Sequence, residues 1–213
     1  MRNYTFLLLL LVAMGTGLSA QTIQTLSPID DTYADGGKST EILGNTQPQQ
    51  MWVKTGSTAA FTRTGFIKFD ISGLSLADVG TAKLRLYCYD TQSTDMVISA
   101  FSIDEAWSES TLTWDNQPAM ITPAVRTQKV ELGAYVEWQI TKLVQDAITL
   151  GKTSISLGLS DENGDNKLAR FYTKESTDPN KPQLYISDEI EDYQALGTID
   201  DAMVVGGTDA DTN

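Results

Sequence analysis

Two segments of the chain alternate basic or aromatic side chains with apolar ones, a pattern that could bind sugars. The first contains Trp52 and Lys54, two residues apart. The second contains Lys83, Arg85, Tyr87 and Tyr89 at the same spacing. Residues two apart on a strand share a face, so each set would present rings that stack on sugars and cations that pair with carboxylates. A solvated sheet face has the same pattern, and spacing alone leaves both interpretations open.

Two acidic clusters could bind calcium, which prefers oxygen ligands. The first cluster consists of Asp30, Asp31 and Asp35. The second, "DENGDN" at 161–166, begins with the spacing of an EF-hand loop, but Tyr172 stands where that loop requires a glutamate. We interpret this segment instead as a β-hairpin turn in which Asn163-Gly164 supplies positive φ. A structural calcium ion is therefore a candidate cofactor at the first cluster.

Catalytic chemistry is restricted because the chain contains no histidine. Ser-His-Asp and Cys-His nucleophile systems are excluded, and so are zinc sites that need imidazole. Two carboxylates suffice for a glycosidase, but the many acids of the chain indicate no particular pair. A lyase would combine a tyrosine base with a charge-neutralising arginine, for which Arg170 with Tyr172 is the local match. The sequence thus favours binding over catalysis.

The distribution of charge indicates one domain followed by a tail. A formal net charge of -13 argues against nucleic-acid binding, which needs a clustered cationic surface. Residues 188–213 contain eight acids and no lysine or arginine. We interpret this segment as a disordered acidic tail or linker. Residues 21–187 then form a single domain, long enough for one core.

The first twenty residues have the pattern of a signal peptide. Arg2 precedes an apolar run at 6–13, and Leu18-Ser19-Ala20 ends the segment with small residues. We expect export, with the mature protein secreted, periplasmic or on the cell surface. The apolar run is too short to span a membrane, and no stop-transfer segment follows. Cys88 is the only cysteine, so no internal disulfide can form.

Short runs with period-two alternation predict an all-β fold. They occur at 66–71, 83–89 and 154–160, and further strands are expected at 51–54, 96–103, 128–132, 134–139, 168–173 and 183–187. One helix is expected at 141–150, where apolar residues share one side and Gly151 follows. Many short strands with one helix predict a β-sandwich of antiparallel strands, specifically a jelly roll.

The segment "WSESTLTWDNQP" places Trp107 and Trp114 in a polar stretch between two expected strands. The connection is too long for a tight hairpin, so it must cross the surface of the sandwich. Such a loop needs buried anchors, and tryptophan offers a large apolar surface with an N–H that can still reach a carbonyl. We interpret both tryptophans as anchors, with ligand stacking as the alternative.

Six segments in order resemble the DNRLRE-type domain, which is also classed as carbohydrate-binding module family 96. They are "DDTYADGG" at 30–37, "FIKFDISGL" at 66–74, "AKLRLY" at 82–87, "WSES" at 107–110, "TWDNQP" at 113–118 and "FYTKES" at 171–176. The resemblance covers about 27–187. The resemblance implies a jelly roll that binds polysaccharide, and alginate-like uronate polymers are among the ligands of the family. Domains of this family are often part of secreted polysaccharide-degrading enzymes.

This resemblance directs attention to Arg63, Tyr172 and Lys174 as ligand contacts. Where the family often has Ser-Arg-Glu, this chain has Thr173-Lys174-Glu175, which keeps a cation without the guanidinium fork. The expected binding residues are Trp52, Lys54, Arg63, Arg85, Tyr87, Tyr172 and Lys174. The expected function is non-catalytic binding of an anionic polysaccharide. The alternatives are a structural or adhesive surface protein, with surface or enzyme proteins as partners, and a small polysaccharide lyase or hydrolase.

Overall fold

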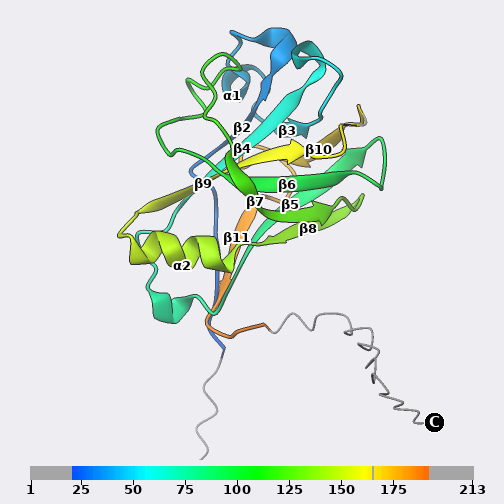
Figure 1. The fold of residues 1–213 in the computed structure, drawn as a ribbon. Coiled ribbons are helices and arrows are strands. Elements are labelled where there is room, and N and C mark those ends of the chain that lie inside the picture. Colours follow the sequence, from blue (N-terminus) through cyan, green and yellow to red (C-terminus); the bar gives the residue numbers. More distant parts are fainter. Residues whose placement is uncertain (1–20, 165, 192–213) are drawn as a thin grey trace, which may run out of the picture.

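The computed structural model describes residues 21–191, except residue 165, and shows a sandwich of two antiparallel β-sheets (Figure 1). The β-sandwich expected from the sequence is therefore confirmed. Most successive strands belong to alternate sheets, as in a jelly roll. The expected signal peptide and residues 192–213 of the expected tail lie outside the described residues.

The two sheets are built from eleven strands among the described residues. Sheet A contains β1 (Ile23–Leu26), β3 (Gln50–Val53), β5 (Thr81–Thr91), β8 (Ala134–Gln139), β10 (Ala169–Tyr172) and β11 (Gln183–Ser187). Its order is β1-β11-β5-β10-β3, and β8 also pairs with β5. Sheet B contains β2 (Asp30–Asp35), β4 (Arg63–Asp70), β9 (Ser154–Asp161), β6 (Val97–Ser102) and β7 (Ile121–Lys129), in that spatial order.

Helix α2 (Thr141–Thr149) closes one end of the sandwich, as Figure 1 shows. It buries Val144 and Ala147, and Gly151 follows at φ +68°, so both the helix and its glycine stop are confirmed. The shorter helical turns are α1 (Leu43–Thr46), η1 (Gly36–Lys38), η2 (Ala59–Phe61) and η3 (Leu76–Asp78). Within 21–191, excluding 165, no helix is long and apolar enough to cross a membrane.

The core lies between the sheets and is centred on large side chains with no exposed surface. Alternation along β5 buries Leu84, Leu86 and Cys88 while the residues between them remain half-buried. Trp138 of β8 is completely buried, and its indole N–H donates to the carbonyl of Ile98 in the opposite sheet at 2.8 Å. This hydrogen bond satisfies a polar group that burial would otherwise make costly.

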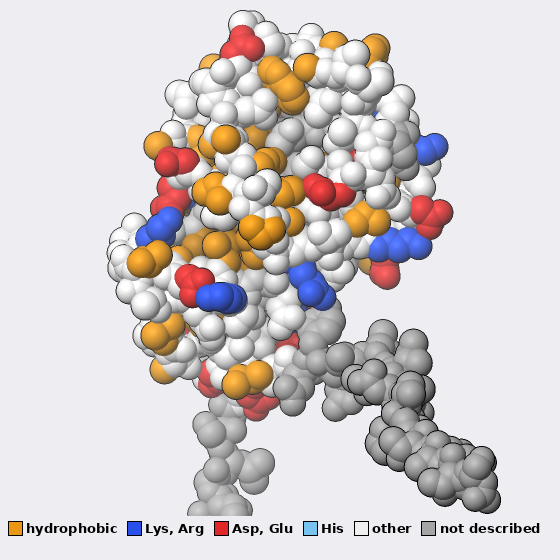
Figure 2. All heavy atoms as spheres, in the orientation of Figure 1, with side chains coloured by type: hydrophobic (Ala, Val, Ile, Leu, Met, Phe, Trp, Pro, Cys, Tyr) orange, Lys and Arg blue, Asp and Glu red, His pale blue; other side chains and the backbone are white. Residues whose placement is uncertain are grey.

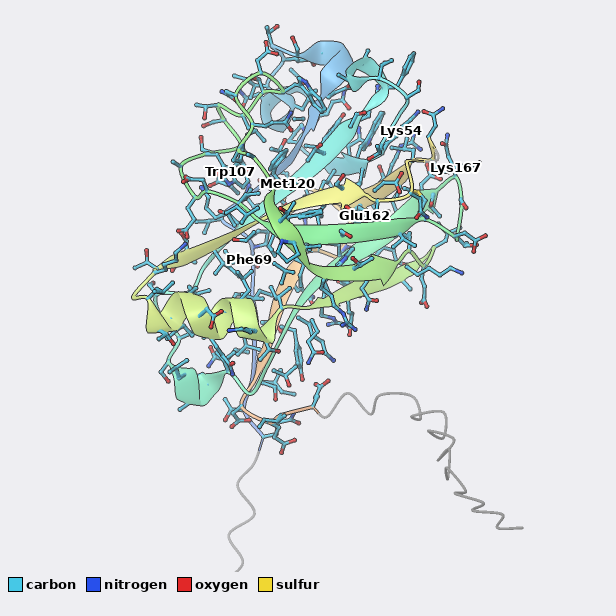
Figure 3. The ribbon with its side chains drawn as sticks, viewed as in Figure 1. Lys54, Phe69, Trp107, Met120, Glu162 and Lys167 are labelled. Atoms are coloured by element: carbon cyan, nitrogen blue, oxygen red, sulfur yellow. The ribbon has the colours of Figure 1, made fainter. Side chains whose placement is uncertain are left out.

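The outer face of sheet B is covered by the loop at 104–120, beside β2, β4 and β9 (Figure 1). Trp107 is only 8% exposed, packs against Phe66, and its indole N–H donates to the Ser156 hydroxyl at 3.2 Å. The buried Lys68 donates to the Trp107 carbonyl. Figure 3 shows Trp107 and Met120 near one another on this side of the molecule. The expected crossing loop is therefore present, with Trp107 as its buried anchor.

Trp114 is less buried than the sequence indicated. It is partly exposed and packs at the edge of the Trp107 cluster. In the orientation of Figure 2, hydrophobic side chains reach the surface mainly above α2, over the loop and neighbouring strands. Trp107 is thus the principal anchor, and Trp114 contributes to the cover over sheet B.

Four elements differ from the sequence prediction. The strand expected at 128–132 is wrong, because β7 covers Ile121–Lys129 as an exposed edge strand that has no alternating burial and tolerates Pro123. Strands β1 and β2 were not expected, and the side chains of β2, including its aspartates, are almost all buried. The expected hairpin at 161–166 is also wrong: Gly164 has φ +63° as predicted, but β9 and β10 belong to different sheets, so the turn joins the sheets.

Candidate carbohydrate-binding surface

The outer face of sheet A brings together side chains from both segments with alternating basic and aromatic residues. Strands β3 and β5 lie on either side of β10, so Trp52, Arg85, Tyr87 and Tyr172 occupy one face. Their neighbours in sequence are buried in the core, whereas these four are half-buried. The loop at 104–120 covers the other sheet. The predicted sharing of a face is therefore borne out, and this face is accessible.

Three tyrosines form a stack across β5 and β10. The ring of Tyr172 lies nearly parallel to that of Tyr89, with centroids 4.4 Å apart, and to that of Tyr87, with centroids 6.0 Å apart. Tyr135 of β8 meets Tyr87 edge to face at 5.4 Å. The three rings therefore cover part of one another's faces.

A hollow of about 520 Å³ lies over one end of this stack. It is lined by Gln49, Gln50, Tyr89, Tyr172, Ser176, Thr177, Asp178 and Pro179. The Tyr89 hydroxyl donates to the Gln50 side chain at 2.9 Å, and the Gln50 amide donates to Gln47 at 3.1 Å. These hydrogen bonds fix the orientation of the polar groups, and amides and hydroxyls so held can recognise sugar hydroxyls.

The opposite end of the face holds two cations that are paired with two acids. A hollow of about 180 Å³ is lined by Lys83, Arg85, Glu137, Tyr185 and Glu191. The Arg85 guanidinium pairs with Glu137 at 2.7 Å and donates to Gln183 at 2.9 Å. Burial tends to lower the pKa of Lys83, but hydrogen bonding to Glu191 and the charges of Glu137 and Glu191 raise it overall. Lys83 is therefore charged at neutral pH, and both cations are held by acidic neighbours.

The sequence profile of carbohydrate-binding module family 96 matches residues 22–188, nearly all of the described chain. The chain belongs to carbohydrate-binding module family 96. The resemblance noted from six short segments is therefore confirmed, and the family supports carbohydrate binding as the function of the sandwich.

One relative of this family 96 module is a gellan lyase from Bacillus sp, 24% identical over 201 residues. The alignment covers 92% of this chain but only 8% of that protein. The module therefore spans a small part of the relative's length, and the lyase name describes the whole of that larger protein.

The indole of Trp52 also lies on this face of the family 96 module, but its ring is already in contact with two side chains. Tyr33 stacks on it at 5.4 Å, and the Arg170 guanidinium lies 4.7 Å from the ring centroid. Arg170 is in turn paired with Asp90. A sugar ring could therefore stack on Trp52 only if it displaced one of these neighbours.

Two of the expected cations lie in ion pairs away from the tyrosine stack. Arg63 pairs with the buried Asp35 at 3.1 Å. Lys174 contacts Glu109, lies 2.5 Å from Glu175 and 3.5 Å from Asp31. Lys54 follows β3 and forms an isolated bridge with Arg63. Arg63 and Lys174 are thus already paired with acidic side chains of the protein, whereas Tyr172 belongs to the tyrosine stack.

The three aspartates of the expected calcium cluster do not converge. Adjacent residues of a strand point to opposite faces, so Asp30 and Asp31 diverge, and Asp35 lies about 13 Å from Asp31 along the strand. Asp30 pairs with Lys68 at 3.2 Å, and Asp35 pairs with Arg63. These side chains therefore do not fit a calcium site together.

The acidic group that does form contains Asp31, Glu109 and Glu175, whose ligand atoms lie within 4.8 Å of one another. The Lys174 ammonium contacts all three carboxylates. Burial raises the pKa of Asp31 to about 8, although the Lys174 charge opposes this rise. The cation that neutralises this group is thus a side chain of the protein.

Several residues of the candidate surface were not among the expected ligand contacts. They are Gln49, Gln50, Tyr135, Asp178 and Tyr185. Period-two alternation could have identified Tyr135 and Tyr185, because each belongs to an expected strand. Asp178 belongs to a loop, where the sequence carries no periodic signal.

Proposed function

We propose that this chain is a non-catalytic module that binds an extended polysaccharide across the outer face of sheet A, and that the ligand carries carboxylate groups. Family membership supports carbohydrate binding. The position of the site rests on one observation. The hollow lined by Gln50, Tyr89 and Tyr172 lies at one end of the outer face of sheet A, and the hollow lined by Lys83 and Arg85 lies at the other end.

Lys83 and Arg85 support an anionic ligand despite the negative charge of the chain, because a ligand carboxylate can take the place of an acidic side chain that now pairs with them. At physiological ionic strength the screening length is about 8 Å, so distant acids act only weakly on a bound carboxylate. Exposed ion pairs contribute only about 0 to 1 kcal/mol each. Useful affinity therefore requires several contacts along an extended chain, and we expect long oligomers to bind better than dimers.

Calorimetry against alginate, pectin and a neutral glucan at two salt concentrations tests this proposal. Tyr89→Ala should weaken binding, whereas Phe61→Ala, an exposed aromatic residue outside the sheets, serves as the control. Weaker binding of the acidic polymers in high salt is expected. Binding of the neutral glucan alone would contradict the carboxylate requirement. If none of the three polymers binds, the structural or adhesive alternative would be favoured.

The absence of catalysis and the export of the protein need separate tests. Incubation with the same polymers should release no unsaturated or reducing ends, and such release would favour the lyase or hydrolase alternative. We also propose that the protein is exported, on the basis of the signal-like segment at 1–20. N-terminal sequencing of the exported protein should begin at Gln21, and retention of Met1 would contradict this assignment.

A further inference from the structure

The segment after β11 folds back along the start of β5. The Thr81 hydroxyl donates to the carbonyl of Glu189 at 2.9 Å, and the backbone N–H of Glu191 donates to that hydroxyl at 2.9 Å. The backbone N–H of Asp188 also donates to the carbonyl of Thr22 at 3.3 Å. Residues 188–191 are thus fixed beside the end of sheet A that carries Lys83 and Arg85.

This arrangement brings an acidic side chain of the protein onto the candidate binding surface. The Glu191 carboxylate lies 2.5 Å from the Lys83 ammonium, which is also 3.6 Å from Glu137. The Lys83 side chain is only 17% exposed, whereas Glu191 is 38% exposed. The Tyr185 ring centroid lies 5.7 Å from the same ammonium. Glu191 thus covers a cation that otherwise belongs to the open face.

We propose that Lys83, Arg85 and Tyr185 form a subsite for one acidic sugar residue, and that Glu191 occupies this subsite as an internal competitor. The inference rests on the proposed polysaccharide binding. It adds the position at which a ligand carboxylate binds and the means by which Glu191 regulates that binding. The hollow of about 180 Å³ is smaller than the roughly 300 Å³ at which pockets for drug-sized ligands begin. It therefore suits one charged ring of a longer chain.

Exchange of Glu191 for a ligand carboxylate is chemically balanced. One carboxylate replaces another on the same ammonium, so no charge remains unpaired in the subsite. The displaced Glu191 is partly exposed and can return to water. A side chain tethered nearby nevertheless competes at a high effective concentration, so it should reduce the measured affinity for uronates.

The decisive comparison is Glu191→Gln against Glu189→Gln in the full chain. Both variants remove one negative charge from the same segment, but the Glu189 side chain is exposed and its residue contacts Thr81 through the backbone carbonyl. Binding of hexameric oligogalacturonate, hexameric oligoalginate and neutral cellohexaose is measured by calorimetry. Glu191→Gln should raise affinity for a uronate hexamer about three- to tenfold, and Glu189→Gln should change it less than twofold.

Lys83→Met completes the test, because it should weaken uronate binding and abolish the gain produced by Glu191→Gln. Equal affinities for Glu191→Gln and wild type would overturn the competition, and so would an equal gain in both glutamine variants. If no variant binds either uronate, the subsite is refuted. If cellohexaose still binds and Tyr89→Ala weakens that binding, polysaccharide binding on this face would remain supported. If none of the three oligomers binds, the result would count against the proposed function itself.

Discussion

The phenol ring of Tyr172 stacks on that of Tyr89, with centroids 4.4 Å apart and an interplanar angle of 16°. Tyr87 lies nearly parallel to Tyr172 as well, with an interplanar angle of 10°. The sequence suggested that Tyr172 would stack directly on a sugar ring. In the structure the Tyr172 ring is instead stacked with the rings of Tyr87 and Tyr89. The contribution of Tyr172 to binding therefore depends on the whole stack.

Tyr172→Ala should therefore weaken polysaccharide binding by about tenfold, the equivalent of one lost aromatic contact of about 1.4 kcal/mol. Tyr172→Phe keeps the stacked ring and should retain most of the affinity. Calorimetry with both variants, using the best polymer of the panel, gives the comparison. Equal losses in the two variants would show that the hydroxyl, and not the stack, carries the contribution.

Trp107→Ala should lower the free energy of unfolding by about 3 to 5 kcal/mol, because it removes a large buried side chain and its hydrogen bond to Ser156. Trp114→Ala should cost less, about 1 to 2 kcal/mol, since its indole is partly exposed. Chemical denaturation measures both. Polysaccharide affinity below the melting temperature should be unchanged, because the loop covers sheet B; a selective loss of affinity would instead assign the indoles to ligand stacking.

The sequence predicted the elements whose burial alternates most clearly. Strands β8 and β11 agree with the expected ranges, and helix α2 differs by one residue at its end. Strand β2 was missed because its aspartates are typical of loops, although pairing with β4 and with cations allows them to be buried. Polar residues in a strand are thus predictable only when their partners are known.

The candidate surface could be predicted only in part for a related reason. Alternation identified which residues of β3 and β5 face outward, and this requires only the strand period. The tyrosine stack depends on the register between β5 and β10, which shifts between Arg170 and Phe171. Nor can spacing show that Lys174 lies among three carboxylates from separate segments. Non-local pairing, rather than residue type, was the missing information.

Above about pH 8, where Asp31 is ionised, Lys174→Met should destabilise the fold by about 3 to 5 kcal/mol, because it leaves Asp31, Glu109 and Glu175 without their shared cation. The Lys174 side chain is 23% exposed and the Asp31 side chain is fully buried, so water can compensate only partly. Denaturant unfolding should show this loss, and adding Asp31→Asn should restore part of it. Lys142→Met, which removes an exposed helical pair, is the control and should cost less than about 0.5 kcal/mol. Equal losses for the two lysines would contradict the central role of Lys174.

The pH dependence of stability should reveal Asp31 itself. Burial raises its pKa to about 8 from an ordinary value of 3.8, so the folded protein holds this proton more tightly than the unfolded chain. Between about pH 4 and pH 8 the unfolded state therefore binds fewer protons, and the contribution of Asp31 to stability must fall as the pH rises.

Asp31→Asn cannot titrate at this position, so it provides the reference. The free energy of unfolding of the wild type, minus that of Asp31→Asn, should decrease steadily from pH 4 to pH 8 and level off outside that range. Asp70 is fully exposed, and hydrogen bonds from Ser72 lower its pKa, so the corresponding difference for Asp70→Asn should be constant between pH 5 and pH 8. A difference for Asp31→Asn that is equally constant over this interval would show that Lys174 keeps Asp31 ionised in the folded protein.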